Sequence, residues 1–182
     1  GMLIHQAQPA VYGHDGLMGS QVPIAVGACY ANRKPTVCFM GDAAAEEDYV
    51  LAALWWAATH HLPILFIVED NNLSILTEKY VRRSWEIIDV ARGFGLASGS
   101  SSDDPDTLYS GIPLIENWPT LINVHTTRLG WHAGAGVDAP NAFDRHREVR
   151  KELPWNTAAW AHDVDINIGI TVREVWQKHC SR

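Results

Sequence analysis

The sequence has few charged residues and no excess of positive charge. Charged residues make up 19% of its 182 positions, whereas about a quarter is typical of soluble proteins. Hydrophobic residues reach 47%, and this combination argues against an intrinsically disordered chain and against a coiled coil. The 14 Lys and Arg residues are outnumbered by 21 Asp and Glu residues, which gives a formal net charge of −7. A nucleic-acid partner is therefore not expected, because binding to phosphates needs a basic surface.

Cysteine and long apolar segments are also scarce. The three cysteines, Cys29, Cys38 and Cys180, lie far apart and form no Cys-x-x-Cys pair, which excludes a disulfide framework and a cysteine metal clamp. No apolar run approaches the roughly 20 residues of a membrane helix, and no basic start leads into an apolar segment. We therefore expect a cytoplasmic protein that does not bind membranes, and we interpret Gly1 before Met2 as the remnant of a tag.

Apolar runs alternate with helical patterns along the chain. The run Pro63–Val68 is apolar throughout, as in a central strand of a parallel sheet that is covered on both faces. The alternation predicts an α/β fold with a mostly parallel sheet and helices on both faces, in a single domain over residues 2–182. The predicted strands cover residues 36–40, 63–68 and 120–125, and the predicted helices cover residues 22–32, 44–60 and 84–94, with a charged helix after residue 144.

Polar residues follow two of the predicted strands. Asp42 comes after the first strand and Asn71 after the second, with one predicted helix between them. The carboxyl ends of neighbouring parallel strands meet at one edge of a sheet, so we expect these two side chains to converge. Carboxylate and amide oxygens suit Mg²⁺, which completes its coordination with phosphate oxygens and water. The helix predicted from Ala44 would direct free backbone N–H groups at such a phosphate.

Each of these features also has an ordinary structural explanation. Gly41-Asp42 after a strand commonly forms a turn in which the aspartate caps the next helix, and Asn71-Asn72 is likewise typical of a turn. Their joint occurrence at this spacing, downstream of a glycine-punctuated loop over residues 13–20, favours a binding site.

Longer segments resemble a known family. Gly41-Asp42-Ala43, followed by residues 44–70 and then Asn71-Asn72, resembles the signature of thiamine-diphosphate-dependent enzymes. Residues 16–23, 36–44 and 62–69 look like the alpha subunits of the 2-oxo acid dehydrogenases, and the resemblance covers roughly residues 5–153. It implies the diphosphate-binding domain of the thiamine-diphosphate-binding fold. Nothing in the sequence resembles the pyrimidine-binding domain of these enzymes, and we expect that domain to be absent.

The resemblance implies roles for individual residues. The side chains of Asp42 and Asn71 and the backbone carbonyl of Leu73 would hold Mg²⁺. His132, in the segment Arg128-Leu129-Gly130-Trp131-His132, takes the position of an active-site histidine that could bind the diphosphate or the substrate carboxylate. The residues that would contact the cofactor are Gly16, Met18, Gly41, Ala43, Ala44, Asn71 and His132.

The activity that the resemblance implies is the oxidative decarboxylation of a 2-oxo acid with thiamine diphosphate and Mg²⁺ as cofactors. In this family the glutamate that activates the cofactor comes from the pyrimidine-binding domain, so the chain would act with a beta-type subunit in a homo- or hetero-oligomer. Two alternatives remain open. One is another thiamine-diphosphate enzyme, either a 2-oxo acid decarboxylase or a transketolase-like carboligase. The other is a pseudoenzyme that serves as a non-catalytic interaction subunit.

The sequence departs from the family pattern at defined positions. Ala43 stands where a third glycine is usual, which predicts that the backbone there does not need a positive φ. Ala133 stands where animal members carry a phosphorylated serine, which excludes that form of regulation. The family's alpha subunits are also longer at the N-terminus. The short length and Ala43 favour the pseudoenzyme alternative.

One predicted helix is apolar around its whole circumference. Residues 49–58 read Tyr-Val-Leu-Ala-Ala-Leu-Trp-Trp-Ala-Ala, whereas a surface helix normally shows a single apolar stripe. Two explanations remain open: the helix is sandwiched inside the domain, or Trp55 or Trp56 contacts another subunit.

Overall fold

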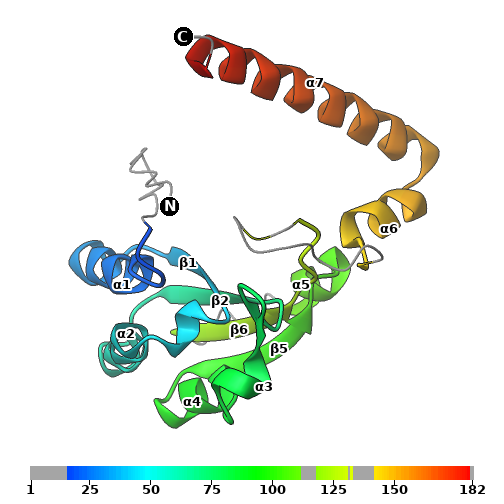
Figure 1. The fold of residues 1–182 in the computed structure, drawn as a ribbon. Helices are drawn as coiled ribbons and strands as arrows, with labels where there is room; N and C mark the ends of the chain where they lie inside the picture. Colours follow the sequence, from blue (N-terminus) through cyan, green and yellow to red (C-terminus); the bar gives the residue numbers. More distant parts are fainter. Residues whose placement is uncertain (1–15, 112–117, 131, 133–141, 181–182) are drawn as a thin grey trace. The chain divides into compact units, whose positions relative to one another are not determined.

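The computed structural model describes residues 16–111, 118–130, 132 and 142–180. Its contacts divide the chain into two compact units, Gly1–Ala142 and Phe143–Arg182. The first unit contains the sheet with its surrounding helices, and the second contains the C-terminal helices (Figure 1).

The sheet of the first unit has four strands in the order β1-β2-β6-β5. All three neighbouring pairs are parallel, which confirms the mostly parallel sheet expected from the alternating pattern. The strands predicted at residues 36–40, 63–68 and 120–125 are present, with ends that differ by no more than two residues. The four strands are β1 (Thr36–Gly41), β2 (Ile64–Asp70), β5 (Ala97–Ser102) and β6 (Thr120–His125).

Helices and a small hairpin connect the strands. The predicted helix at residues 22–32 is confirmed as α1, and Arg33 ends it in the left-handed conformation with φ 56°. The helix predicted from residue 84 is wrong at its start, because α4 begins only at Ile87. The connecting elements are α1 (Gln21–Asn32), the 3₁₀ helix η1 (Ala44–Glu46), α2 (Asp48–Thr59), β3 (Leu73–Ser74), β4 (Thr77–Glu78), α3 (Lys79–Arg82), α4 (Ile87–Gly93) and α5 (Pro105–Gly111).

The two faces of the sheet carry separate apolar clusters. Because side chains alternate along a strand, Phe66 and Val68 of β2 point to one face and Leu65 to the other. The larger cluster packs Phe66 and Val68 against α1, α2 and α4. The smaller cluster packs Leu65, Ile122 and Val124 against Leu108 of α5. Helices therefore lie on both faces, as predicted.

The apolar helix is α2, and only part of its circumference is buried. Its inward residues, such as Val50 and Leu54, are fully buried in the larger cluster. Trp55 and Trp56 remain 44% and 41% exposed in this chain. The explanation in which the whole helix is sandwiched inside the domain is therefore wrong, because the domain leaves Trp55 and Trp56 partly uncovered.

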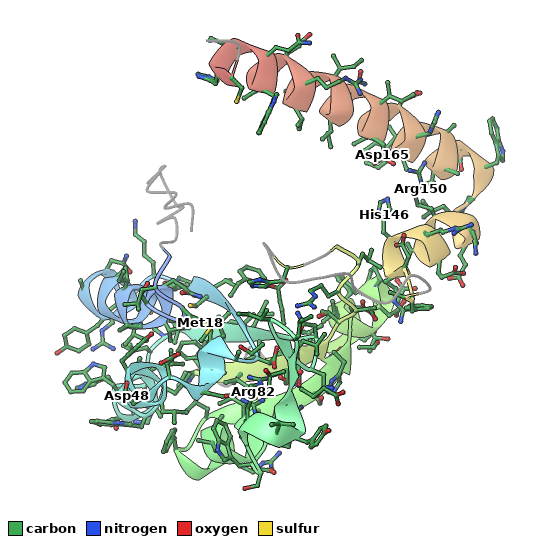
Figure 2. The ribbon with its side chains drawn as sticks, viewed as in Figure 1. Met18, Asp48, Arg82, His146, Arg150 and Asp165 are labelled. Carbon is green, nitrogen blue, oxygen red and sulfur yellow. The ribbon has the colours of Figure 1, made fainter. Side chains whose placement is uncertain are left out.

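The second unit consists of α6 (Arg145–Glu152) and α7 (Trp155–Cys180). The carboxylate of Asp144 accepts a hydrogen bond from the Arg147 backbone N–H at 3.0 Å, which caps the charged helix expected in this region. Arg150 of α6 pairs with Asp165 of α7 (Figure 2). None of the described helices combines the length and the apolarity needed to cross a membrane.

Candidate functional site

The predicted site residues follow two neighbouring strands. β1 and β2 are paired in parallel, and Gly41, the last residue of β1, is level with Glu69 of β2. Asp42 and Asn71 therefore leave the same edge of the sheet from adjacent strands. The expectation that one crossover brings both positions to one edge is confirmed at the level of the strands. The sheet rule for α/β proteins places ligands at this edge.

Asp42 is buried and paired with an arginine. Only 2% of its side chain is exposed, and its carboxylate oxygen Oδ2 accepts a hydrogen bond from Nη2 of Arg82. The second terminal nitrogen of Arg82, Nη1, lies 2.5 Å from Oε1 of Glu46. Arg83 donates to the Asp42 backbone carbonyl at 3.1 Å. Figure 2 shows Arg82 on the segment that follows the hairpin, so residues distant in sequence complete this site.

Asn71 begins a tight turn after β2. Its side-chain oxygen Oδ1 accepts a hydrogen bond from the Leu73 backbone N–H at 2.9 Å. The next residue, Asn72, has φ 66°, a left-handed conformation that asparagine tolerates better than most residues. The turn keeps Leu73 close to Asn71, as the expected metal ligand set requires. The amide oxygen of Asn71 keeps a second lone pair.

The last residue of β2, Asp70, is the centre of a buried polar network. Its Oδ2 accepts hydrogen bonds from Lys79 Nζ at 2.9 Å and from Asn123 Nδ2 at 3.0 Å, and its Oδ1 accepts from the Asn72 N–H at 3.0 Å. Burial raises the pKa of Asp70, but the hydrogen bonds from Lys79, Asn123 and Asn72 outweigh it and hold the pKa below its ordinary value.

The same network acts on Lys79. Burial lowers the pKa of the Lys79 ammonium, but its contacts with Asp70 and with Glu86 at 3.0 Å prevail and hold the pKa above its ordinary value. This lysine therefore remains charged and fixes the start of α3 to the end of β2. Sequence reasoning missed the network, although Asn123, a polar residue in the apolar run Leu-Ile-Asn-Val, is a visible signal of a buried hydrogen bond.

The glycine loop upstream of α1 is packed on the segment after Asp42. The hydroxyl of Tyr49 donates to the backbone carbonyl of Met18. Gly19 has φ 84°, and a Cβ added there would lie 2.8 Å from Val50 Cγ2 and 3.1 Å from the Ala44 carbonyl oxygen. Gly19 is thus required both for its conformation and for the close approach. Met18 itself remains 45% exposed, and Gly16 is exposed as well.

The backbone after β1 differs from the expectation in one respect. Ala44 begins a three-residue 3₁₀ helix, and α2 begins at Asp48, because Glu47 is extended with ψ 138°. The prediction that the long helix starts at Ala44 is therefore wrong, because only a single 3₁₀ turn begins there. Ala43 has φ −72°, which confirms that the alanine there does not need a positive φ.

His132 is exposed, and its neighbours Trp131 and residues 133–141 lie outside the described residues. The start of the glycine loop, residues 13–15, also lies outside them. Asp42, Ala43 and Ala44 thus follow β1, and Asn71 and Leu73 follow β2, at the same edge of the sheet.

The donor chemistry of this edge fits a hard divalent cation. Asp42 offers a carboxylate and Asn71 an amide oxygen, and Leu73 follows with its carbonyl. Within the described residues no group of three or more His, Cys, Asp or Glu side chains could hold a metal, so a site here depends on amide and backbone oxygens. The guanidinium of Arg82 is the cation that the structure places at Asp42.

Comparisons with known proteins agree on one family. Residues 1–152 match the family described as Dehydrogenase E1 component. The pyruvate dehydrogenase E1 component subunit alpha of Rickettsia prowazekii is 30% identical over 156 residues, which cover 77% of this chain and 46% of that protein. The mouse mitochondrial 2-oxoisovalerate dehydrogenase subunit alpha is 30% identical over 150 residues, covering 70% of this chain and 34% of that protein.

A solved structure is similar as well. A proposed thiamin diphosphate-dependent enzyme from Mycobacterium smegmatis superimposes with a TM-score of 0.53 and 28% identity, over 62% of this chain and 23% of that one. The chain thus spans less than half the length of these relatives.

Proposed function

Because the chain belongs to the dehydrogenase E1 component family, we propose that it is the diphosphate-binding, alpha-type part of a thiamine-diphosphate-dependent 2-oxo acid dehydrogenase. The observation that carries the proposal is the parallel pairing of β1 with β2, which leaves Asp42 and Asn71 at one sheet edge. The family resemblance of both positions supports the same assignment.

Asp42, Asn71 and the carbonyl of Leu73 would hold Mg²⁺, and Ala43 and Ala44 would lie against the diphosphate. When bound, thiamine diphosphate supplies the electron sink for decarboxylation. The Asn71 turn and the Lys79–Asp70 pair fix the backbone on one side of this site, and the contact of Tyr49 with Met18 fixes it on the other. His132 is the proposed contact for the diphosphate or for the carboxylate of the substrate.

A beta-type subunit with the pyrimidine-binding domain and its glutamate is the proposed partner. Exposed apolar side chains support the need for one. Val37 and Phe39 on the edge strand β1 are 52% and 55% exposed, and Trp55 and Trp56 of α2 are exposed too. Aromatic side chains are enriched in the cores of protein interfaces.

The direct test is the melting temperature of the full chain, alone and with a co-expressed beta-type subunit, with and without thiamine diphosphate and Mg²⁺. Binding to the folded state raises the melting temperature by mass action, by an amount that grows with ligand concentration. An Asp42→Asn variant should lose the shift. An unchanged melting temperature in wild type, with the partner present, would refute cofactor binding.

A non-catalytic interaction subunit is the second candidate. The guanidinium of Arg82 at Asp42 favours it, because a buried carboxylate that already has a cation needs no metal. Turnover of a 2-oxo acid by the assembled complex distinguishes the two. Cofactor binding without turnover supports the interaction subunit.

A further inference from the structure

Arg82 bridges two carboxylates at the predicted metal position. It ends the short α3 helix, its side chain is 11% exposed, and its two terminal nitrogens contact Asp42 and Glu46 separately. Asp42 follows β1, and Glu46 lies in η1, so one guanidinium ties together two segments on either side of Ala43 and Ala44.

A second arginine supports the same arrangement from behind. The side chain of Arg83 is 2% exposed, and its Nη1 lies 3.4 Å from Oε1 of Glu46. Its guanidinium packs 4.6 Å from the centre of the Trp85 ring. With both arginines in place, two positive charges face the two carboxylates of Asp42 and Glu46. The protein thereby neutralises the Asp42 carboxylate with its own side chains.

Oδ2 of Asp42 already accepts from Arg82, so a divalent ion on the same carboxylate would lie close to the guanidinium, and two cations repel each other in a buried site. Nε of Arg82 and Nε and Nη2 of Arg83 are buried and have no hydrogen-bond partner among the described residues. The ion pair with Asp42 therefore holds Arg82 in a position where its buried Nε has no hydrogen-bond partner among the described residues.

We propose that Arg82 is a competitor for the metal: its guanidinium neutralises the Asp42 carboxylate, and its release from Oδ2 favours a divalent ion there. The inference rests on the proposed function, because it concerns the same metal. Leu73 and Arg82 lie at the two ends of one segment that contains β3, β4 and α3. Metal binding at Leu73 and release of Arg82 from Asp42 therefore involve the same segment.

The competition sets the affinity for the metal. If the metal-competent state is the minor one in which Arg82 has left Asp42, the apparent dissociation constant rises by the inverse of its population. Removing the guanidinium should tighten binding by about 10- to 100-fold, the value of a charge-assisted hydrogen bond expressed as an equilibrium constant.

The test measures Mn²⁺ binding to the full chain by electron paramagnetic resonance, since Mn²⁺ accepts the same oxygen ligands as Mg²⁺. Arg82→Gln should bind Mn²⁺ about 10- to 100-fold more tightly than wild type. Arg82→Lys, which keeps a charge but not the fork of donors, should lie between them. Arg92→Gln is the matched control, because Arg92 pairs with Asp89 at 2.7 Å on the surface, and its affinity should equal that of wild type.

Equal Mn²⁺ affinity of Arg82→Gln and wild type would overturn the competition and leave the proposed function standing. Absence of Mn²⁺ binding in every variant, also with the beta-type subunit and thiamine diphosphate present, would overturn both. A double-mutant cycle on the metal-free protein, with Arg82→Gln, Asp42→Asn and their combination, measures the ion pair itself by urea unfolding. A coupling there without any Mn²⁺ binding assigns Arg82 a purely structural role and contradicts the competition.

Discussion

Replacing Lys79 with glutamine removes the ammonium that neutralises Asp70 and leaves the rest of the network in place. The side chain of Asp70 is 1% exposed and that of Lys79 is 16% exposed, so the pair is largely shielded from water. Breaking a buried ion pair by removing one partner costs about 3–5 kcal/mol. Asn123 and the Asn72 N–H still donate to Asp70, so we expect a loss near or below the lower limit, about 2–3 kcal/mol at pH 7.

The loss depends on pH in a direction that the pKa values set. The pKa of Asp70 is held below its ordinary value of 3.8, so its contribution to stability is present above about pH 4 and is lost as the pH falls further. The pKa of Lys79 is held above 10.5, so its contribution is present below that pH and is lost above it. The difference between wild type and Lys79→Gln should therefore be largest between these limits and should shrink towards pH 3.

Urea unfolding at pH 7 and at a series of pH values below 4 measures the difference. A loss of 2–3 kcal/mol lowers the midpoint by about 1–2 M urea for a domain of this size. Arg92→Gln breaks an exposed ion pair with Asp89 and should cost no more than about 0.5 kcal/mol. A loss for Lys79→Gln as small as this control, or one that does not shrink at any pH below 4, would refute the role given to the Asp70 network.

Two further predictions follow from packing and burial. Gly19→Ala should cost about 1–3 kcal/mol of unfolding free energy, because the added Cβ clashes with Val50 and the φ of 84° is strained for alanine. Gly27→Ala is the control and should stabilise α1, because no atom lies within 4 Å of the added Cβ. Equal effects of the two substitutions on the unfolding free energy would contradict the close approach at Gly19. Burial raises the pKa of Cys38 to about 12, so a thiol reagent at pH 8 should modify exposed Cys180 quickly and Cys38 only on unfolding. Rapid modification of Cys38 in the folded protein would contradict its burial.

Much of the fold could be predicted from the sequence because the central strands are strongly patterned. β1, β2 and β6 are apolar runs that end in polar residues, and that pattern is typical of a parallel sheet. β5 was missed, since Ala-Ser-Gly-Ser-Ser-Ser has a low intrinsic preference for strands. It forms because its backbone pairs with β6 at the edge of the sheet.

The site was predictable only where it depends on local sequence. Asp42 and Asn71 could be identified because each follows a strand, and parallel pairing brings adjacent strand ends together. The partners of these residues could not, because Arg82 and Lys79 come from α3, a four-residue helix without a periodic pattern. The start of α2 was misplaced since the run of alanines and acidic residues after Asp42 suits a helix, and only Glu47 in an extended conformation interrupts it.

In the proposed site, Asp42 and Asn71 share one divalent cation that binds the diphosphate of the cofactor. Calorimetric titration of thiamine diphosphate into the full chain with its beta-type partner, with Mg²⁺ and then with a chelator, tests it most directly. We expect binding that requires Mg²⁺. Asp42→Asn and Asn71→Ala should each weaken it by at least about 10-fold, the range seen when groups that support a metal site are removed. Binding that is unchanged in both variants, or that persists without a divalent ion, would contradict it.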